Sequence, residues 1–132
     1  MQSSGVEDLE AYRSARDLAR EMGRTFAESE DSACAKNPAS LRLIADLRAG
    51  IEAISTLIAQ EVALQKAGQR PDFGALFLKA SAACRETAIR IGCARAQGLV
   101  TPLRAAAWIQ TCDHMSVLLD ALYAHRPEVV AA

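Results

Sequence analysis

Aromatic residues are scarce in this chain of 132 residues, and glycine and proline are few. Phe, Trp and Tyr make up 5% of the sequence, beside 7 glycines and 4 prolines. Collagen-like chains need far more Gly and Pro, and all-β domains of this size usually need more aromatic and β-branched residues. Hydrophobic residues still account for 51% of the chain, which excludes a disordered protein because disordered chains are poorer in apolar residues.

The sequence also lacks an excess of charge of either sign. It has 15 Lys and Arg against 16 Asp and Glu, which gives a net charge of −1. Dedicated nucleic-acid-binding domains are usually strongly basic, because they neutralise phosphates and release counterions. A nucleic-acid role for this chain therefore requires a local basic patch.

Metal-binding cysteine motifs are absent. The four cysteines form no C-x-x-C pair and no short cluster with histidine, so we predict no metal site. We interpret Cys84, Cys93 and Cys112 as small core residues of a reduced cytosolic protein. Cys34 falls in a predicted loop and is the one candidate for an exposed thiol.

Long apolar runs are missing as well. No uncharged window reaches the roughly 18 residues that a membrane-spanning helix needs, and the N-terminus lacks the basic and apolar regions of a signal peptide. The sequence therefore predicts a cytoplasmic protein without a membrane partner.

Residues that favour helices are abundant. The chain contains 27 alanines and 12 arginines, and both types lose little free energy on entering a helix. A capping-box pattern joins Ser4 to Glu7, and Asn37, Pro71 and Thr101 stand at the next expected helix starts. We predict helices over residues 5–29, 38–67, 72–97 and 102–125.

Apolar residues repeat at steps of three and four in each predicted helix, as expected for a helix with a buried face. The three connecting loops are short, so consecutive helices must run antiparallel. The chain is therefore predicted to be all-α, with residues 1–132 forming a single up-down-up-down antiparallel four-helix bundle. The second helix carries an additional apolar line, Leu43, Leu57 and Leu64, which suggests an interface for self-association.

Catalytic patterns are absent from the predicted bundle. A di-iron site needs two Glu-x-x-His motifs, and neither His114 nor His125 has a Glu three residues before it. Cys112, Asp113 and His114 are adjacent, so on a helix they point in different directions and form no triad. No phosphate-binding glycine loop is present. We predict that the protein is not an enzyme and holds no metal or cofactor.

A line of arginines on the first predicted helix is the best candidate binding surface. Arg13, Arg16, Arg20 and Arg24 fall within about 80° of one another at about 100° per residue. They are positioned to bind phosphates or an acidic partner. The alternative is a solvated face, because four acidic residues run beside the arginines and suggest pairs such as Glu10–Arg13 and Asp17–Arg20. The acidic residues are Glu10, Asp17, Glu21 and Glu28.

Three segments resemble a family of small four-helix bundles. The segment Val6-Glu7-Asp8-Leu9-Glu10-Ala11-Tyr12 is similar to its opening motif F-E-D-L-x-x-[WY]. Residues 47–54 resemble Q-L-R-R-A-x-x-S-I, and residues 73–87 resemble E-F-x-x-F-L-x-I-A-x-G-S-x-x-E. The family comprises proteins encoded in 23S ribosomal RNA intervening sequences and the accessory variability determinants of diversity-generating retroelements. Its N-I-A-E-G turn aligns with residues 57–61 but is not kept here, so the second helix should extend to Gly68.

The resemblance implies a homo-oligomer, in particular a pentamer. For the retroelement branch it also implies a complex with a reverse transcriptase and with RNA or DNA. It supplies no catalytic residues. Two functions remain open from the sequence. One is a non-enzymatic accessory subunit associated with a reverse transcriptase or nucleic acid, and the other is a protein-only oligomeric scaffold or adaptor.

Overall fold

The described part of the chain folds into four α-helices, with a short turn of 3₁₀ helix before the first. The computed structural model describes residues 6–28, 37–68 and 74–125, and within these ranges there is no strand. Of the described helices, none is both long and apolar enough to span a membrane. The elements are η1 (Val6–Asp8, a 3₁₀ helix), α1 (Glu10–Glu28), α2 (Pro38–Lys66), α3 (Ala75–Ala96) and α4 (Pro102–Ala124).

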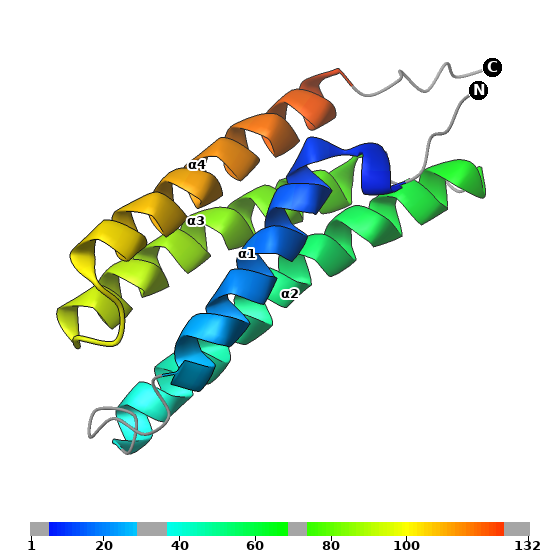
Figure 1. Ribbon diagram of the computed structural model, residues 1–132. Helices are drawn as coiled ribbons and strands as arrows, with labels where there is room; N and C mark the ends of the chain where they lie inside the picture. The colour runs from blue at the N-terminus through cyan, green and yellow to red at the C-terminus, as the bar shows by residue number, and fades with distance from the viewer. Residues whose placement is uncertain (1–5, 29–36, 69–73, 126–132) are drawn as a thin grey trace.

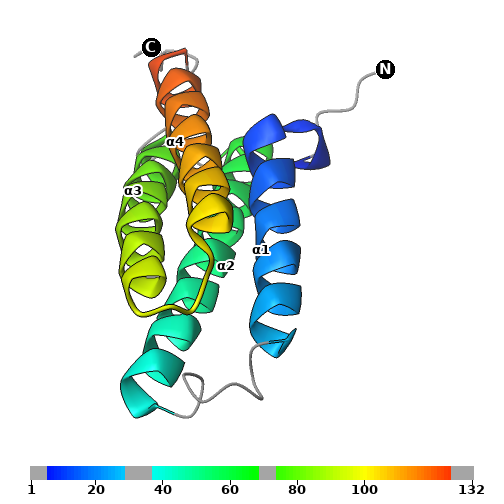
Figure 2. The ribbon, with the colours of Figure 1, turned by 60° about the vertical axis from the view of Figure 1, so that its left-hand side comes forward.

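The four helices form an antiparallel up-down-up-down bundle (Figures 1 and 2). Each helix packs against the next one in the sequence, and α1 also packs against α4. Among the described residues, the diagonal pairs α1/α3 and α2/α4 have no Cα atoms within 8 Å of each other. The predicted all-α class and bundle topology are thereby confirmed.

Local capping explains why α2 and α4 begin where the sequence predicts. The Asn37 side chain accepts a hydrogen bond of 2.8 Å from the Ala39 N–H. Thr101 accepts one of 3.2 Å from the Arg104 N–H. A proline follows each capping residue, where its missing N–H costs nothing. Helix α2 ends at Lys66, one residue before the predicted end.

The starts of α1 and α3 differ from the predicted bounds. Residues 6–8 form the 3₁₀ helix and α1 begins at Glu10, whereas Ser4 of the predicted capping box lies outside the described residues. Helix α3 begins at Ala75 and not at 72, because Gly74 adopts a left-handed conformation with φ +83°. Residues 72 and 73 lie outside the described ranges. Gly74 offers no capping side chain, and the carboxylate of Glu61 on α2 takes that role.

The buried faces predicted for the helices pack together in one core. Trp108 contacts Phe26 edge to face, with ring centroids 5.7 Å apart. Cys84 and Cys112 are buried as predicted, but Cys93 is exposed, so its assignment to the core was wrong. Cys93 lies nine positions after Cys84, which places the two on opposite sides of α3 at about 100° per residue. Cys34 lies outside the described residues.

Candidate functional site on helices α1 and α2

The predicted arginine line lies on the exposed surface of α1. Arg13, Arg16, Arg20 and Arg24 are all exposed. Arg16 and Arg20 line a surface hollow of about 330 Å³ between α1 and α2. A neighbouring hollow on α1 is lined by Arg13, Arg16 and Arg20 together with Asp17. The structure therefore places Arg16 and Arg20 in the hollow between α1 and α2, the α1/α2 groove, and Arg13 beside it.

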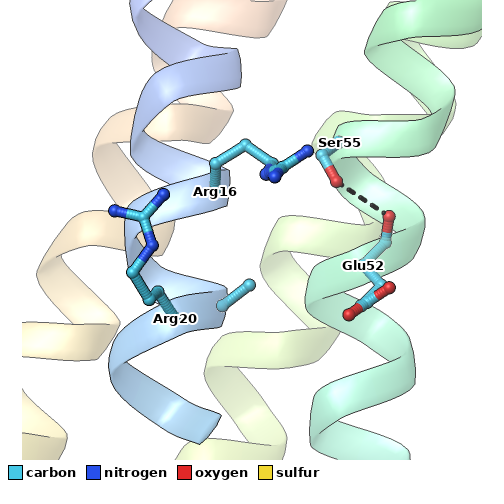
Figure 3. Close-up of a pocket in the computed structure, with 5 residues that line it drawn as sticks. Arg16, Arg20, Glu52 and Ser55 are labelled. Carbon is cyan, nitrogen blue, oxygen red and sulfur yellow. Dashed lines mark hydrogen bonds between the residues drawn. The ribbon is translucent and has the colours of Figure 1, made fainter. Parts of the chain in front are cut away.

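Helix α2 supplies the opposite wall of the α1/α2 groove. Glu52 and Ser55 face Arg16 and Arg20 across it, and Thr56 and Gln60 continue the wall. Figure 3 shows the Arg16 side chain reaching from α1 toward Ser55, while the carboxylate of Glu52 points away from it. The Ser55 hydroxyl donates to the backbone carbonyl of Glu52 at 3.0 Å, so its oxygen remains able to accept hydrogen bonds.

An aromatic ring closes one end of the groove. Tyr12 is half-buried and lines the hollow together with Arg16. The Arg16 guanidinium lies 5.9 Å from the centroid of the Tyr12 ring and donates to the Tyr12 hydroxyl at 3.2 Å. This pair places a planar cation beside an aromatic ring, and both groups can stack against a planar ligand.

The acidic residues of α1 do not all stay beside the arginines. Asp17 pairs with Arg20 at 3.4 Å, as predicted. Glu10 lies 2.9 Å from Nε2 of His114 on α4, and Glu21 accepts a hydrogen bond of 3.0 Å from the Trp108 indole N–H. Two of the four carboxylates are therefore used in fastening α1 to α4.

The tertiary structure adds a fifth arginine that the sequence did not point to. Arg48 of α2 reaches α1 beside Gly23, where an added Cβ would lie 3.6 Å from its guanidinium nitrogen. Within the described part of the chain, Arg16, Arg24 and Arg48 form no ion pair. These cations are available to an external anion.

Comparison of the chain with protein-family models, with curated proteins and with solved structures gives no match. The family resemblance therefore stays a prediction.

The predicted oligomer interface on α2 is largely used within the bundle. Leu43, Leu57 and Leu64 are all half-buried, and Leu43 and Leu57 pack against the core. The large hydrophobic side chains with the highest exposure lie on α3 and α4, with Ile89 at 69% and Val117 at 66%, whereas Leu41 on α2 is 48% exposed. The interface prediction itself stays untested.

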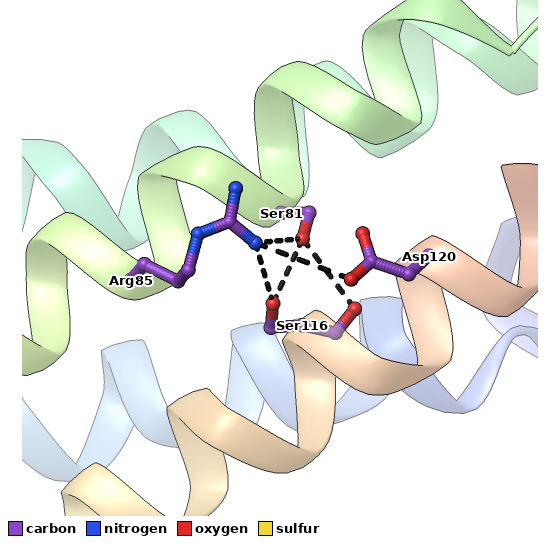
Figure 4. Close-up of polar contacts among 4 residues, drawn as sticks. All are labelled: Ser81, Arg85, Ser116 and Asp120. Atoms are coloured by element: carbon purple, nitrogen blue, oxygen red, sulfur yellow. Dashed lines mark hydrogen bonds and ion pairs between the residues drawn. The ribbon is translucent and has the colours of Figure 1, made fainter.

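A second polar cluster joins α3 to α4. Ser81 and Ser116 are buried with their hydroxyl oxygens 2.8 Å apart. Arg85 donates to both hydroxyls and lies 4.0 Å from Asp120 (Figure 4). Every side chain in this cluster has partners within the bundle, so the cluster holds two helices together and offers no open site.

The buried thiols beside this cluster are chemically quiet. Burial raises the pKa of Cys84 and of Cys112 to about 12, so both remain protonated at neutral pH and are poor nucleophiles. Among the described residues, no three His, Cys, Asp or Glu side chains are grouped as metal ligands. The α1/α2 groove is thus the strongest candidate site.

Proposed function

We propose that this protein is a non-enzymatic helical-bundle accessory protein that binds the phosphate backbone of RNA or DNA through the α1/α2 groove. One observation carries the proposal. The carboxylates of Glu10 and Glu21 contact α4, which leaves the arginines on the other side of α1 with fewer acidic neighbours than the sequence suggests.

The spacing of the arginines suits a repeating anion. Arg13 and Arg24 are eleven residues apart, which corresponds to about 16 Å along a helix, and a nucleic-acid strand offers several phosphates over such a length. Guanidinium groups bind phosphate oxygens in pairs of parallel hydrogen bonds. The local arrangement therefore supplies the basic patch that a chain with a net charge of −1 requires.

The family resemblance extends this proposal to a more specific role. We propose a subunit of a diversity-generating retroelement that associates with a reverse transcriptase and assembles as a homo-oligomer, specifically a pentamer. In such an assembly, the α1/α2 groove of each copy adds phosphate contacts, and multivalent contacts raise the overall affinity.

Fluorescence anisotropy with labelled RNA and DNA oligonucleotides tests the binding. The variant Arg16→Gln/Arg20→Gln removes two groove cations, and Lys79→Gln/Arg95→Gln removes two from α3, which does not contact α1. We expect the groove variant to weaken binding and to lower the slope of log affinity against log salt by about 1.5. Glu52→Gln should strengthen binding, because it removes from the groove a negative charge that repels phosphates.

Binding should depend on which cationic residues are replaced and not only on the number of positive charges removed. The α3 variant should bind like the unmodified protein. Absence of binding even at low salt contradicts the proposal, and so does an equal loss of affinity in the two double variants.

A protein-only scaffold is the second candidate, and the exposed apolar side chains favour it. Ile89, Val117 and Leu103 are 69%, 66% and 84% exposed, and exposed apolar surface is used in protein interfaces. Light scattering measures the oligomeric state directly. A mass equal to the 14.1 kDa of one chain contradicts an assembly through these residues or through Leu43, Leu57 and Leu64.

A further inference from the structure

We infer that the α1/α2 groove binds single-stranded nucleic acid, with its phosphates on the arginines of α1 and its bases against α2 and Tyr12. The inference rests on the proposed function and specifies its ligand. Two properties of the groove carry it: the hydrogen-bonding side chains on the α2 wall and the Tyr12–Arg16 pair.

The wall on α2 suits the edges of unpaired bases. Ser55, Thr56 and Gln60 line the hollow opposite Arg16 and carry both donors and acceptors. The Ser55 oxygen has acceptor capacity left after its bond to the Glu52 carbonyl. Base edges are open to such contacts in a single strand, whereas pairing occupies them in a duplex.

The Tyr12–Arg16 pair suits the faces of unpaired bases. Single-strand-binding proteins combine a cationic track for the backbone with aromatic rings on which bases stack. The guanidinium of Arg16 lies over the Tyr12 ring at 5.9 Å, at the edge of the hollow that Ser55 and Gln60 also line. A base thus meets a ring, a planar cation and hydrogen-bonding groups within one hollow.

Binding of a labelled 12-nucleotide single strand and of its 12-base-pair duplex at equal salt tests the inference. We expect the single strand to bind at least tenfold more tightly. The variant Tyr12→Leu should lose about 5- to 150-fold, as expected when stacking of one base is removed. Tyr12→Phe keeps the ring and removes only the hydroxyl contact to Arg16, so it should bind within about twofold of the unmodified protein and serves as the matched control.

Crosslinking provides a second measurement, since Tyr12 packs against the core and its replacement by Leu changes the fold's stability as well. A single strand containing 4-thiouridine is irradiated with the unmodified protein, and the attachment sites are located by mass spectrometry. We expect attachment at Tyr12 and within residues 52–63. Attachment confined to α3 and α4 overturns the inference.

The failures of the two proposals are distinguishable. If the duplex binds as tightly as the single strand and Tyr12→Leu has no effect, the groove binds phosphate backbones without recognising unpaired bases. In that case this inference is wrong and the proposed function stands. If neither nucleic acid binds at low salt, the proposed function fails and the inference fails with it.

Discussion

Replacement of Glu61 should strongly destabilise the bundle, because this carboxylate of α2 caps the N-terminus of α3. Glu61 is 2% exposed. Its oxygens accept hydrogen bonds of 3.0 Å from the Gly74 N–H, 3.1 Å from the Leu76 N–H and 2.9 Å from the Gln65 side chain. The first N–H groups of a helix have no partner within the helix, and a negative charge there also interacts favourably with the helix dipole.

The contacts set the expected magnitude. The variant Glu61→Ala leaves the buried Gly74 N–H without a partner, and one unsatisfied buried group costs about 1–3 kcal/mol. Loss of a helix cap typically costs about 0.5–2 kcal/mol. We expect a total loss of about 2–4 kcal/mol for Glu61→Ala, a large part of the 5–15 kcal/mol by which typical domains are stable. Glu61→Gln keeps one acceptor oxygen but turns an amide N–H₂ toward a backbone donor, so we expect about 1–2 kcal/mol.

Urea unfolding followed by circular dichroism at 222 nm measures these changes. The midpoint should fall while the slope of free energy against urea stays the same. The control Glu52→Ala changes an exposed glutamate on the same helix and should stay within about 0.5 kcal/mol of the unmodified protein. A Glu61→Ala variant as stable as this control would refute the cross-helix cap.

Three further predictions concern the helix packing and the thiols. A Cβ at Gly50 would lie 3.0 Å from the buried Thr87 hydroxyl, to which the described residues supply no hydrogen-bond partner. Gly50→Ala should therefore gain its full helix-propensity benefit of about 1 kcal/mol only in a Thr87→Ala background. If a double-mutant cycle measured by urea unfolding shows no coupling between the two substitutions, the contact does not restrict the alanine. Burial raises the pKa of the Cys84 and Cys112 thiols from 9.0 to about 12. In a Cys34→Ser variant, a thiol reagent should therefore modify only Cys93 in the native state and all three remaining thiols after unfolding. The same shifts predict that the free energy of unfolding falls between pH 9 and pH 12, because only the unfolded state releases these protons in that range, and a flat pH profile would contradict the assignment.

The fold was predictable because its signals are local. The start of α2 at Asn37-Pro38 depends on one side chain and its own backbone, and the start of α4 at Thr101-Pro102 does as well. Apolar periodicity placed the buried faces, and short loops required antiparallel neighbours. The start of α3 was predicted less well, because the cap comes from Glu61, thirteen residues before Gly74 and on another helix.

The candidate site was predictable only in part. Helical spacing placed the arginines of α1 on one face, since that relation lies within a single helix. The role of Arg48 depends on the register of α2 against α1, and Glu10 has its contact with His114 because α4 lies on the other side of α1. No pattern within one helix encodes either relation.

The sequence by itself determined the four helices, their buried faces and the line of arginines, because hydrogen bonds, caps and periodicity act over a few residues. The tertiary structure alone decided which charges remain available. Packing of α4 against α1 engages Glu10 and Glu21, whereas packing of α2 brings Ser55 opposite Arg16 and Arg48 beside Gly23. A charge acts over distances in space and not along the chain, so the proposed binding surface exists only once the helices have packed.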